Sequence, residues 1–211
     1  MSRITAIQLN KSKKRVNVFF DSASSLTVNK SVVEEMGLRK GMDISDEQTK
    51  ELMHADQFHR CLEAAVRYMA YRPRSEMELR QRLYQRGFRD NIIIPVLAKL
   101  KSQDIIDDEA FATYWRDIRQ TTSPRSQRML KYELQKKGIT SDLVDKTIGD
   151  IDDVAAAYKV GLKKARLLSS TNYTDFVKRL SNYLKWRGFD FEVIAVVSKR
   201  LWQEKQTGDI S

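Results

Sequence analysis

The sequence predicts a mainly α-helical protein of three tandem three-helix repeats behind a small N-terminal module that contains β-structure. Only 3 prolines and 8 glycines occur in 211 residues, and Lys, Arg, Leu, Glu and Gln are plentiful, which favours helix over sheet. A motif also recurs three times at nearly constant spacing. We expect the N-terminal module over residues 1–50 and the repeats over 51–105, 106–150 and 151–211, the last with a C-terminal tail.

The recurring motif sets the order of the repeats. Pro73-Arg74-Ser75 returns as Pro124-Arg125-Ser126, an offset of 124 − 73 = 51 residues, whereas the third copy begins at Thr174-Asp175 and has lost the proline. Paired leucines and a basic-glycine-apolar turn follow in each copy. They are Leu79, Leu83 and Arg86-Gly87-Phe88; Leu130, Leu134 and Lys137-Gly138-Ile139; and Leu180, Leu184 and Arg187-Gly188-Phe189.

The N-terminal module has the alternation typical of strands. We expect strands at Ile4–Leu9 and Arg15–Phe20, joined by the polar stretch Asn10–Lys14, and a third at Ser25–Val28. A short helix from Ser31 to Met36 should end at a glycine. Because a hairpin alone is marginally stable, this module should pack on the first repeat or on a partner.

Each repeat reads as three helices. The first is expected over 51–71 in the first copy, and paired acids should open its counterparts after Ile106 and Ile151. The middle helix should be capped by Ser75, Ser126, and Thr174 or Asp175, and should end at its glycine. Third helices are expected over 92–100, 143–148 and 193–201.

Charge gives the first indication of function. The net charge of +10 attracts polyanions such as nucleic acid, although basic composition alone decides nothing. We find no apolar stretch of membrane-spanning length and no signal-type segment, so we expect a soluble, cytoplasmic protein. Cys61 is the only cysteine, which excludes an intrachain disulfide or a thiolate metal cluster.

The middle helix of each repeat and its flanks carry most of the candidate binding residues. Stacked repeats would align equivalent cations into one basic surface for DNA phosphates or for acidic side chains of a protein partner, although a solvated helix face is the simpler alternative for any single residue. This basic stripe consists of Arg72, Arg74, Arg80, Arg82, Arg86, Arg125, Arg128, Lys131, Lys136, Lys137, Lys178, Arg179, Lys185 and Arg187.

Aromatic residues give weaker evidence of binding. At helical spacing most of their rings should belong to the core. They are Tyr68, Tyr71, Tyr84, Trp115, Tyr132, Tyr183 and Trp186. Tyr84 and Trp186 are the best candidates for exposed rings, because they lie beside the basic turn.

No constellation supports catalysis, and we expect no cofactor and no metal. The segment Gly37–Gly41 has the wrong length for a phosphate-binding loop. His54 and His59 are five apart, which does not place them together on a helix as zinc ligands. The acids Asp107–Glu109 read as helix caps rather than Mg²⁺ ligands. Cys61 lies in an apolar helical run and should be buried.

The ordered set of motifs resembles the RecX family of regulatory proteins. Residues 71–75, Glu78-Leu79-Arg80, Leu83 and Arg86-Gly87-Phe88 are similar to the first-repeat signature of that family. The second signature is matched by residues 105–112 and by later residues. These are Tyr114-Trp115, Arg119, Pro124-Arg125-Ser126, Glu133-Leu134 and Lys137-Gly138-Ile139. The resemblance covers residues 58–150 well and the third repeat more loosely.

The resemblance implies an elongated, curved array of repeats that binds the RecA recombinase filament on DNA. It further implies a non-enzymatic, monomeric regulator that mostly inhibits recombinase ATPase and strand exchange in homologous recombination, DNA repair and the SOS response. Single- or double-stranded DNA would be contacted through its phosphates. The alternative is a sequence-nonspecific DNA-binding helical protein that acts without a recombinase. Charge spread over three helices favours backbone contact over base reading by one recognition helix.

Overall fold

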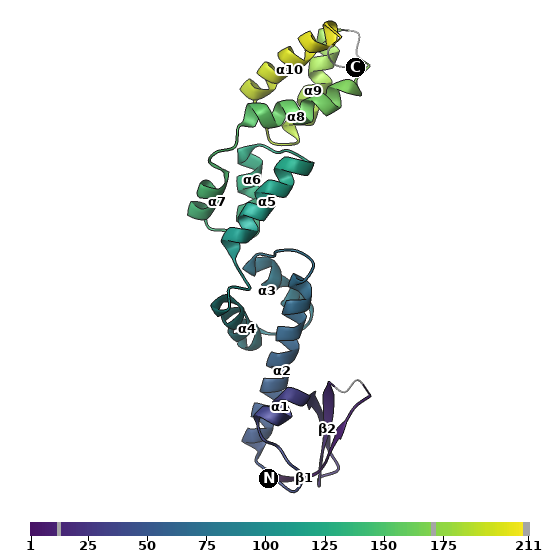
Figure 1. The fold of residues 1–211 in the computed structure, drawn as a ribbon, viewed down its shortest axis with the longest axis vertical. Coiled ribbons are helices and arrows are strands. Elements are labelled where there is room, and N and C mark those ends of the chain that lie inside the picture. Colours follow the sequence, from purple (N-terminus) through teal and green to yellow (C-terminus); the bar gives the residue numbers. More distant parts are fainter. Residues whose placement is uncertain (12–13, 170–171, 209–211) are drawn as a thin grey trace. The chain divides into compact units, whose positions relative to one another are not determined.

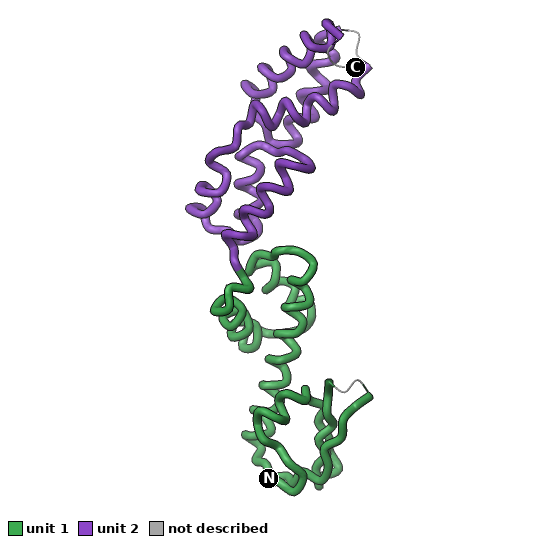
Figure 2. The backbone as a smooth tube through the Cα atoms, in the orientation of Figure 1, with its two compact units in different colours: residues 1–106 green, residues 107–211 purple. Residues whose placement is uncertain are grey.

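The computed structural model describes residues 1–11, 14–169 and 172–208, with ten helices and four strands among them (Figure 1). The chain divides into two units, residues 1–106 and 107–211, which are coloured separately in Figure 2 and treated one at a time below. The mainly helical class with a small N-terminal sheet is confirmed.

The first unit opens with a four-stranded sheet, β1 (Ser2–Leu9), β2 (Arg15–Phe20), β3 (Ser25–Asn29) and β4 (Asp43–Ile44). The strand order is β3-β2-β1-β4, and each neighbouring pair is antiparallel. Alternate residues of β2, from Val16 to Phe20, point into the module core. The three expected strands are present. The strand β4 was not predicted, because two residues are too few to show an alternating pattern in the sequence. The expected connection Asn10–Lys14 includes residues 12 and 13, which lie outside the described residues.

Two helices follow the strands of this module. The short α1 (Lys30–Glu35) is capped by the side chain of Asn29. The long α2 (Asp46–Met69) begins five residues before the expected Glu51, because Ser45 and Gln48 form a reciprocal capping box that starts the helix there. Leu52, near its beginning, is buried in the core of the sheet module.

The sheet module is attached to α2 by a buried carboxylate. Asp56 is 6% exposed, and its carboxylate accepts the backbone N–H of Asn29 at 2.7 Å and the guanidinium of Arg15 at 3.1 Å. Glu63, two turns further along α2, accepts the side-chain amide of Asn29 at 3.0 Å. A single helix therefore contributes to both the sheet module and the first repeat.

The first repeat combines the second half of α2 with α3 (Glu76–Gln85) and α4 (Asp90–Ser102). Ser75 caps α3 as expected, its hydroxyl accepting the N–H of Glu78. Gly87 then takes a φ of +88°, the left-handed conformation that glycine adopts most readily. Leu79 and Leu83 face a core that includes Cys61.

The second unit begins with α5 (Asp108–Thr122), α6 (Gln127–Lys136) and α7 (Ser141–Ile148). The expected caps are confirmed: Asp107 accepts the N–H groups of Glu109 and Ala110, and Ser126 caps α6. Phe111, Leu130 and Leu134 are fully buried in the core of these helices.

Three further helices complete the unit, α8 (Asp153–Arg166), α9 (Tyr173–Lys185) and α10 (Phe191–Gln206). Asp152 caps α8, as the paired acids predict. The expected cap of α9 is wrong: Asn172, rather than Thr174 or Asp175, caps it by accepting the N–H of Asp175. Residues 209–211 of the expected tail lie outside the described residues.

The start of α6 is joined to the turn between α9 and α10. The N–H of Ser126 donates to the carbonyl of Arg187 at 3.1 Å, and the guanidinium of Arg128 donates to the carbonyl of Gly188 at 3.3 Å. A Cβ on Gly188 would lie 2.6 Å from Ser126 Oγ and 2.7 Å from Met129 Cβ. Glycine is therefore required here for close approach as well as for its φ of +88°.

Candidate nucleic-acid interface

The residues of the basic stripe form three groups: those paired with carboxylates, those packed on aromatic rings, and those that are exposed without a carboxylate partner in the ranges that the structure describes. Only the third group is available to bind another molecule. Among the described residues, the structure pairs five members of the stripe with carboxylates. The pairs are Arg72–Glu78 at 2.9 Å, Arg80–Glu76 and Arg80–Asp90 at 3.4 Å, Arg125–Glu133 at 3.1 Å, Lys131–Asp145 at 2.5 Å and Arg179–Asp175 at 3.0 Å.

One carboxylate shows how strongly such pairs act. Burial tends to raise the pKa of Glu76, but the ammonium of Lys101 and the guanidinium of Arg80 outweigh it and hold that pKa below its ordinary value. The stabilisation from this group is therefore present above the ordinary pKa and is lost as pH falls through the lowered one. Arg80 thus has a structural role in the first unit.

A second group lies on aromatic rings. The guanidinium of Arg74 is 4.1 Å from the centroid of Tyr68, and that of Arg187 is 4.0 Å from the centroid of Tyr183. Lys137 lies 4.2 Å from the centroid of Trp115, and Arg82 lies 5.6 Å from Tyr68. Cation–π contacts of this kind fix the side chains against their own repeat.

Glu133 organises the second repeat. Its Oε2 accepts from Trp115 Nε1 and Arg119 Nε, both at 2.8 Å, and its Oε1 lies 3.1 Å from Arg125 Nε. The side chain of Glu133 is only 15% exposed. Such a shielded network stabilises the fold more than surface ion pairs do, and it removes Arg125 from the set of free cations.

The third group is exposed and, within the described part of the chain, has no carboxylate partner. Its members are Arg86, Arg128, Lys136, Lys178 and Lys185. Among the described residues, Arg128 bonds a carbonyl. Lys136 lies about as far from the ring of Tyr132, at 5.7 Å, as Arg82 does from Tyr68, but Lys136 is exposed whereas Arg82 is half-buried. We call these five residues the free cations. They include at least one residue from each repeat, and four of them lie in the second unit.

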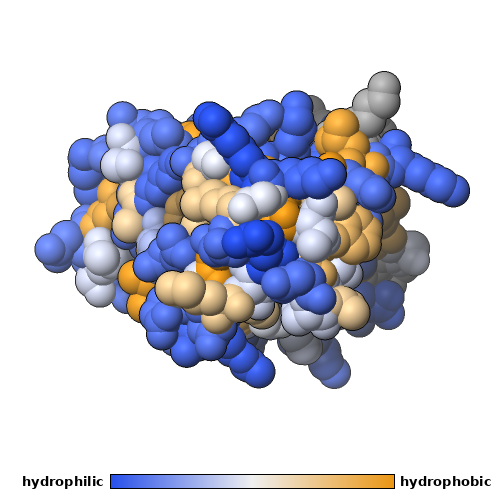
Figure 3. Space-filling view, turned by 90° about the horizontal axis from the view of Figure 1, so that it is seen from below, coloured by the Kyte–Doolittle hydropathy of each residue, from blue (hydrophilic) through white to orange (hydrophobic). Residues whose placement is uncertain are grey.

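The expected core location of the aromatic residues is only partly correct. Tyr68, Trp115 and Tyr183 are partly buried, as expected. Tyr71, in the turn before α3, and Tyr132, on α6, are 82% and 58% exposed. Trp186, an expected exception, is 82% exposed beside the free cation Lys185. The face in Figure 3 is mostly hydrophilic, with apolar residues in small separate patches.

The residues considered for catalysis have structural environments. Cys61 is fully buried, and burial raises the pKa of its thiol to about 11. His59 lies 3.3 Å from Glu35, and Asp56 anchors the sheet module. Nowhere in the described ranges do three or more His, Cys, Asp or Glu side chains form a group that could hold a metal. Likewise, no described helix has both the length and the apolar character needed to cross a bilayer.

A basic hollow in the first unit was not anticipated from the sequence. It has a volume of about 380 Å³ and is lined by Arg15, Arg60, Glu63, Ala64, Arg67, Arg86 and Phe88. Of its charged residues, only Arg86 belongs to the basic stripe. Arg15, Arg60, Glu63 and Arg67 fall outside the repeated motif, so the repeat offset gives no signal for them.

Three family models match successive parts of the chain. Residues 2–45 match the regulatory protein RecX N-terminal domain, residues 61–100 the first three-helix domain of RecX, and residues 107–148 the second. Two relatives are each named "Regulatory protein RecX". The one from Geobacillus thermodenitrificans is 31% identical, over 84% of this chain and 67% of the relative. The one from Bacillus licheniformis is 30% identical, over 99% of this chain and 81% of the relative.

Solved structures share the fold. A crystal structure of regulatory protein RecX has a TM-score of 0.72 at 23% identity, covering 94% of this chain and all of that one. RecX from Lactobacillus salivarius has a TM-score of 0.59 at 23% identity, covering 70% and 97%.

Fold and surface together define a helical-repeat protein with an N-terminal sheet module and exposed cations on its repeats. The matched domains and relatives make the assignment specific: the chain belongs to the RecX family of regulatory proteins.

Proposed function

We propose that this protein is a non-enzymatic regulator that binds the RecA–DNA filament in the cytoplasm as a monomer. It lowers recombinase ATPase and strand exchange during recombination and DNA repair, with DNA phosphates as auxiliary contacts. Membership of the RecX family supports the regulatory role. The observation that carries the proposal is the set of free cations, which includes residues of every repeat while the other stripe residues are held by acids or rings.

The filament test uses three free cations of the second unit. Lys136, Lys178 and Lys185 would be changed together to Glu, which leaves the buried cores and the Glu133 network intact. The rate of ATP hydrolysis by RecA on single-stranded DNA is then measured against the concentration of the regulator. Charge reversal at an interface changes association strongly, so we expect the concentration for half-inhibition to rise by about tenfold or more.

A matched control carries the same change in charge elsewhere in that unit. Lys163, Arg166 and Lys199 are exposed, lie outside the stripe and have no ion-pair partner among the described residues. Their reversal to Glu should change the half-inhibition concentration by no more than about twofold. Equal effects of the two triple variants would remove the free cations from the mechanism.

A second control separates the filament from DNA alone. The parent protein should inhibit at well below one regulator per recombinase, and added bare DNA should shift the curve little. If ATPase falls only in proportion to the DNA sequestered, the protein acts as a sequence-nonspecific DNA binder and the filament proposal fails.

A further inference from the structure

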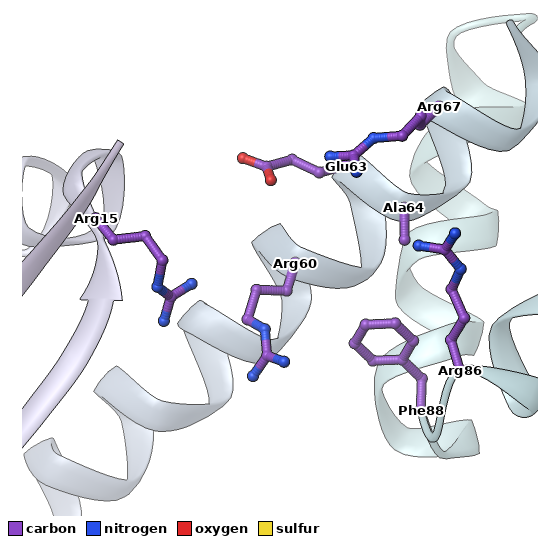
Figure 4. Close-up of a pocket in the computed structure, with 7 residues that line it drawn as sticks. All are labelled: Arg15, Arg60, Glu63, Ala64, Arg67, Arg86 and Phe88. Carbon is purple, nitrogen blue, oxygen red and sulfur yellow. The ribbon is translucent and has the colours of Figure 1, made fainter. Parts of the chain in front are cut away.

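The basic hollow of the first unit contains an excess of uncompensated positive charge. Four arginines and one glutamate line it. Figure 4 shows that they come from three elements: Arg15 from β2, Arg60, Glu63 and Arg67 from α2, and Arg86 with Phe88 from the turn after α3. Arg60, Arg67 and Arg86 are exposed and have no ion-pair partner within the described ranges.

The one acid of the hollow is already engaged. Glu63 accepts the side-chain amide of Asn29 at 3.0 Å, and Figure 4 shows its carboxylate pointing toward the strand side, away from Arg86. Arg15 is held in place by the buried carboxylate of Asp56 at 3.1 Å. The hollow therefore has one anchored arginine in its wall and three available ones around it.

The hollow continues in both directions along α2. A neighbouring hollow of about 220 Å³ shares Arg60, Arg86 and Phe88 and adds Arg89. Another, of about 450 Å³, shares Glu63 and Arg67 and adds Lys14. From Gln57 to Arg67 the helix rises roughly 15 Å, at about 1.5 Å per residue. Six cations line the three hollows beside this stretch of α2: Lys14, Arg15, Arg60, Arg67, Arg86 and Arg89. The stretch is longer than a single carboxylate or phosphate could span.

A row of cations of this length suits a ligand that carries regularly spaced anions. One guanidinium group can bind two phosphate oxygens at once. Cations arranged along a groove contact a nucleic-acid backbone without reading its sequence. The hollow is too small to admit the body of a duplex, whereas a single phosphodiester strand fits. We propose that this hollow is a binding site for the phosphate backbone of single-stranded nucleic acid.

The test is direct binding without any recombinase, so its outcome is independent of the ATPase experiment. The full chain is titrated into a fluorescently labelled single-stranded oligonucleotide, and anisotropy is followed at several salt concentrations. The variant Arg60→Ala, Arg67→Ala, Arg86→Ala should weaken binding by about tenfold or more. It should also reduce the slope of log affinity against log salt by about 2, since each single-strand phosphate contact contributes about 0.7.

Charge loss alone is controlled in the same unit. Arg39, Lys40 and Lys50 are exposed, line none of the three hollows and have no ion-pair partner among the described residues. Their replacement by Ala removes the same charge and should change affinity by at most about twofold. Far-UV circular dichroism should be the same for parent, test and control proteins.

A variant of opposite sign completes the test. Glu63→Gln keeps an oxygen acceptor for Asn29 but removes the negative charge, so we expect two- to threefold tighter binding, a rough value for one charge near a phosphate. Equal losses in the test and control triples would overturn the proposal. So would unchanged DNA binding by the test triple accompanied by loss of binding to polyglutamate, which would assign the hollow to an acidic protein segment.

Discussion

The joint between α6 and the turn after α9 makes a sharp prediction about two glycines. Gly87 and Gly188 occupy the same place in their repeats and have the same φ of +88°, but they differ in their surroundings. Among the described residues, no neighbouring atom lies within 4 Å of a Cβ built on Gly87, whereas a Cβ on Gly188 would meet Ser126 Oγ at 2.6 Å and Met129 Cβ at 2.7 Å. Replacing each with Ala therefore separates backbone strain from crowding.

The two costs can be estimated separately. An alanine in the left-handed region costs roughly 1–2 kcal/mol, and this should be the whole effect of Gly87→Ala. Gly188→Ala adds overpacking, typically about 1–3 kcal/mol, because the new methyl group displaces the hydroxyl that caps α6. We expect the free energy of unfolding to fall by about 1.5 kcal/mol in the first variant and by about 3–4 kcal/mol in the second.

The positions of the tryptophans provide the assay. All three tryptophans, at positions 115, 186 and 202, lie in the second unit. Tryptophan fluorescence during denaturant unfolding should therefore report Gly188→Ala strongly and Gly87→Ala hardly at all, while far-UV circular dichroism reports both. If the two variants lost the same free energy, the joint would relax without cost and the argument for a close-packed contact would be refuted.

Four further experiments, three with variants and one with the parent protein, test other parts of the structure. Asp56→Ala should destabilise the first unit by about 3 kcal/mol, because the guanidinium of Arg15 and the N–H of Asn29 lose their acceptor. Urea unfolding measures this loss, and the exposed control Glu51→Ala on the same helix should leave the stability nearly unchanged. Glu133→Ala should cost about 2–3 kcal/mol and shift tryptophan emission, and an unchanged spectrum would contradict the network. Burial raises the pKa of Asp153, so the charge of this carboxylate opposes folding at neutral pH. The variant Asp153→Asn should therefore be more stable than the parent protein at pH 7. A difference in stability that does not shrink as the pH falls toward 4 would contradict this reasoning. Cys61, with its pKa near 11, should resist iodoacetamide at pH 8 until urea unfolds the protein, and rapid labelling of the native protein would argue against burial.

Local signals in the sequence were sufficient for much of the fold. Ser75, Ser126, Asp107 and Asp152 cap their helices as predicted, because an N-cap depends on residues two or three positions away. The start of α2 was misplaced, because Ser45 and Gln48 precede the apolar pattern that was used to find the helix. The two-residue strand β4 depends on pairing with β1, about 40 residues away, which periodicity cannot show.

The binding surface was predicted less well than the fold, for a physical reason. Charge counted along one helix ignores the acids of its neighbours: Asp90 reaches Arg80 from α4, and Asp145 reaches Lys131 from α7. For the basic hollow the sequence pattern instead missed residues that do come together. Arg15 and Arg67 are far apart in the sequence and line the same hollow only because the sheet module packs on α2.

The joint at Gly188 also bears on how freely this part of the sequence can change. Both acceptors that it offers, the carbonyls of Arg187 and Gly188, belong to the backbone and would be supplied by any amino acid. The third repeat has lost the Pro-Arg-Ser start of the other two, yet its turn still meets α6 through these atoms. The hydrogen bonds of this joint therefore depend on no particular side chain of the third repeat, whereas its close packing requires that position 188 carry none.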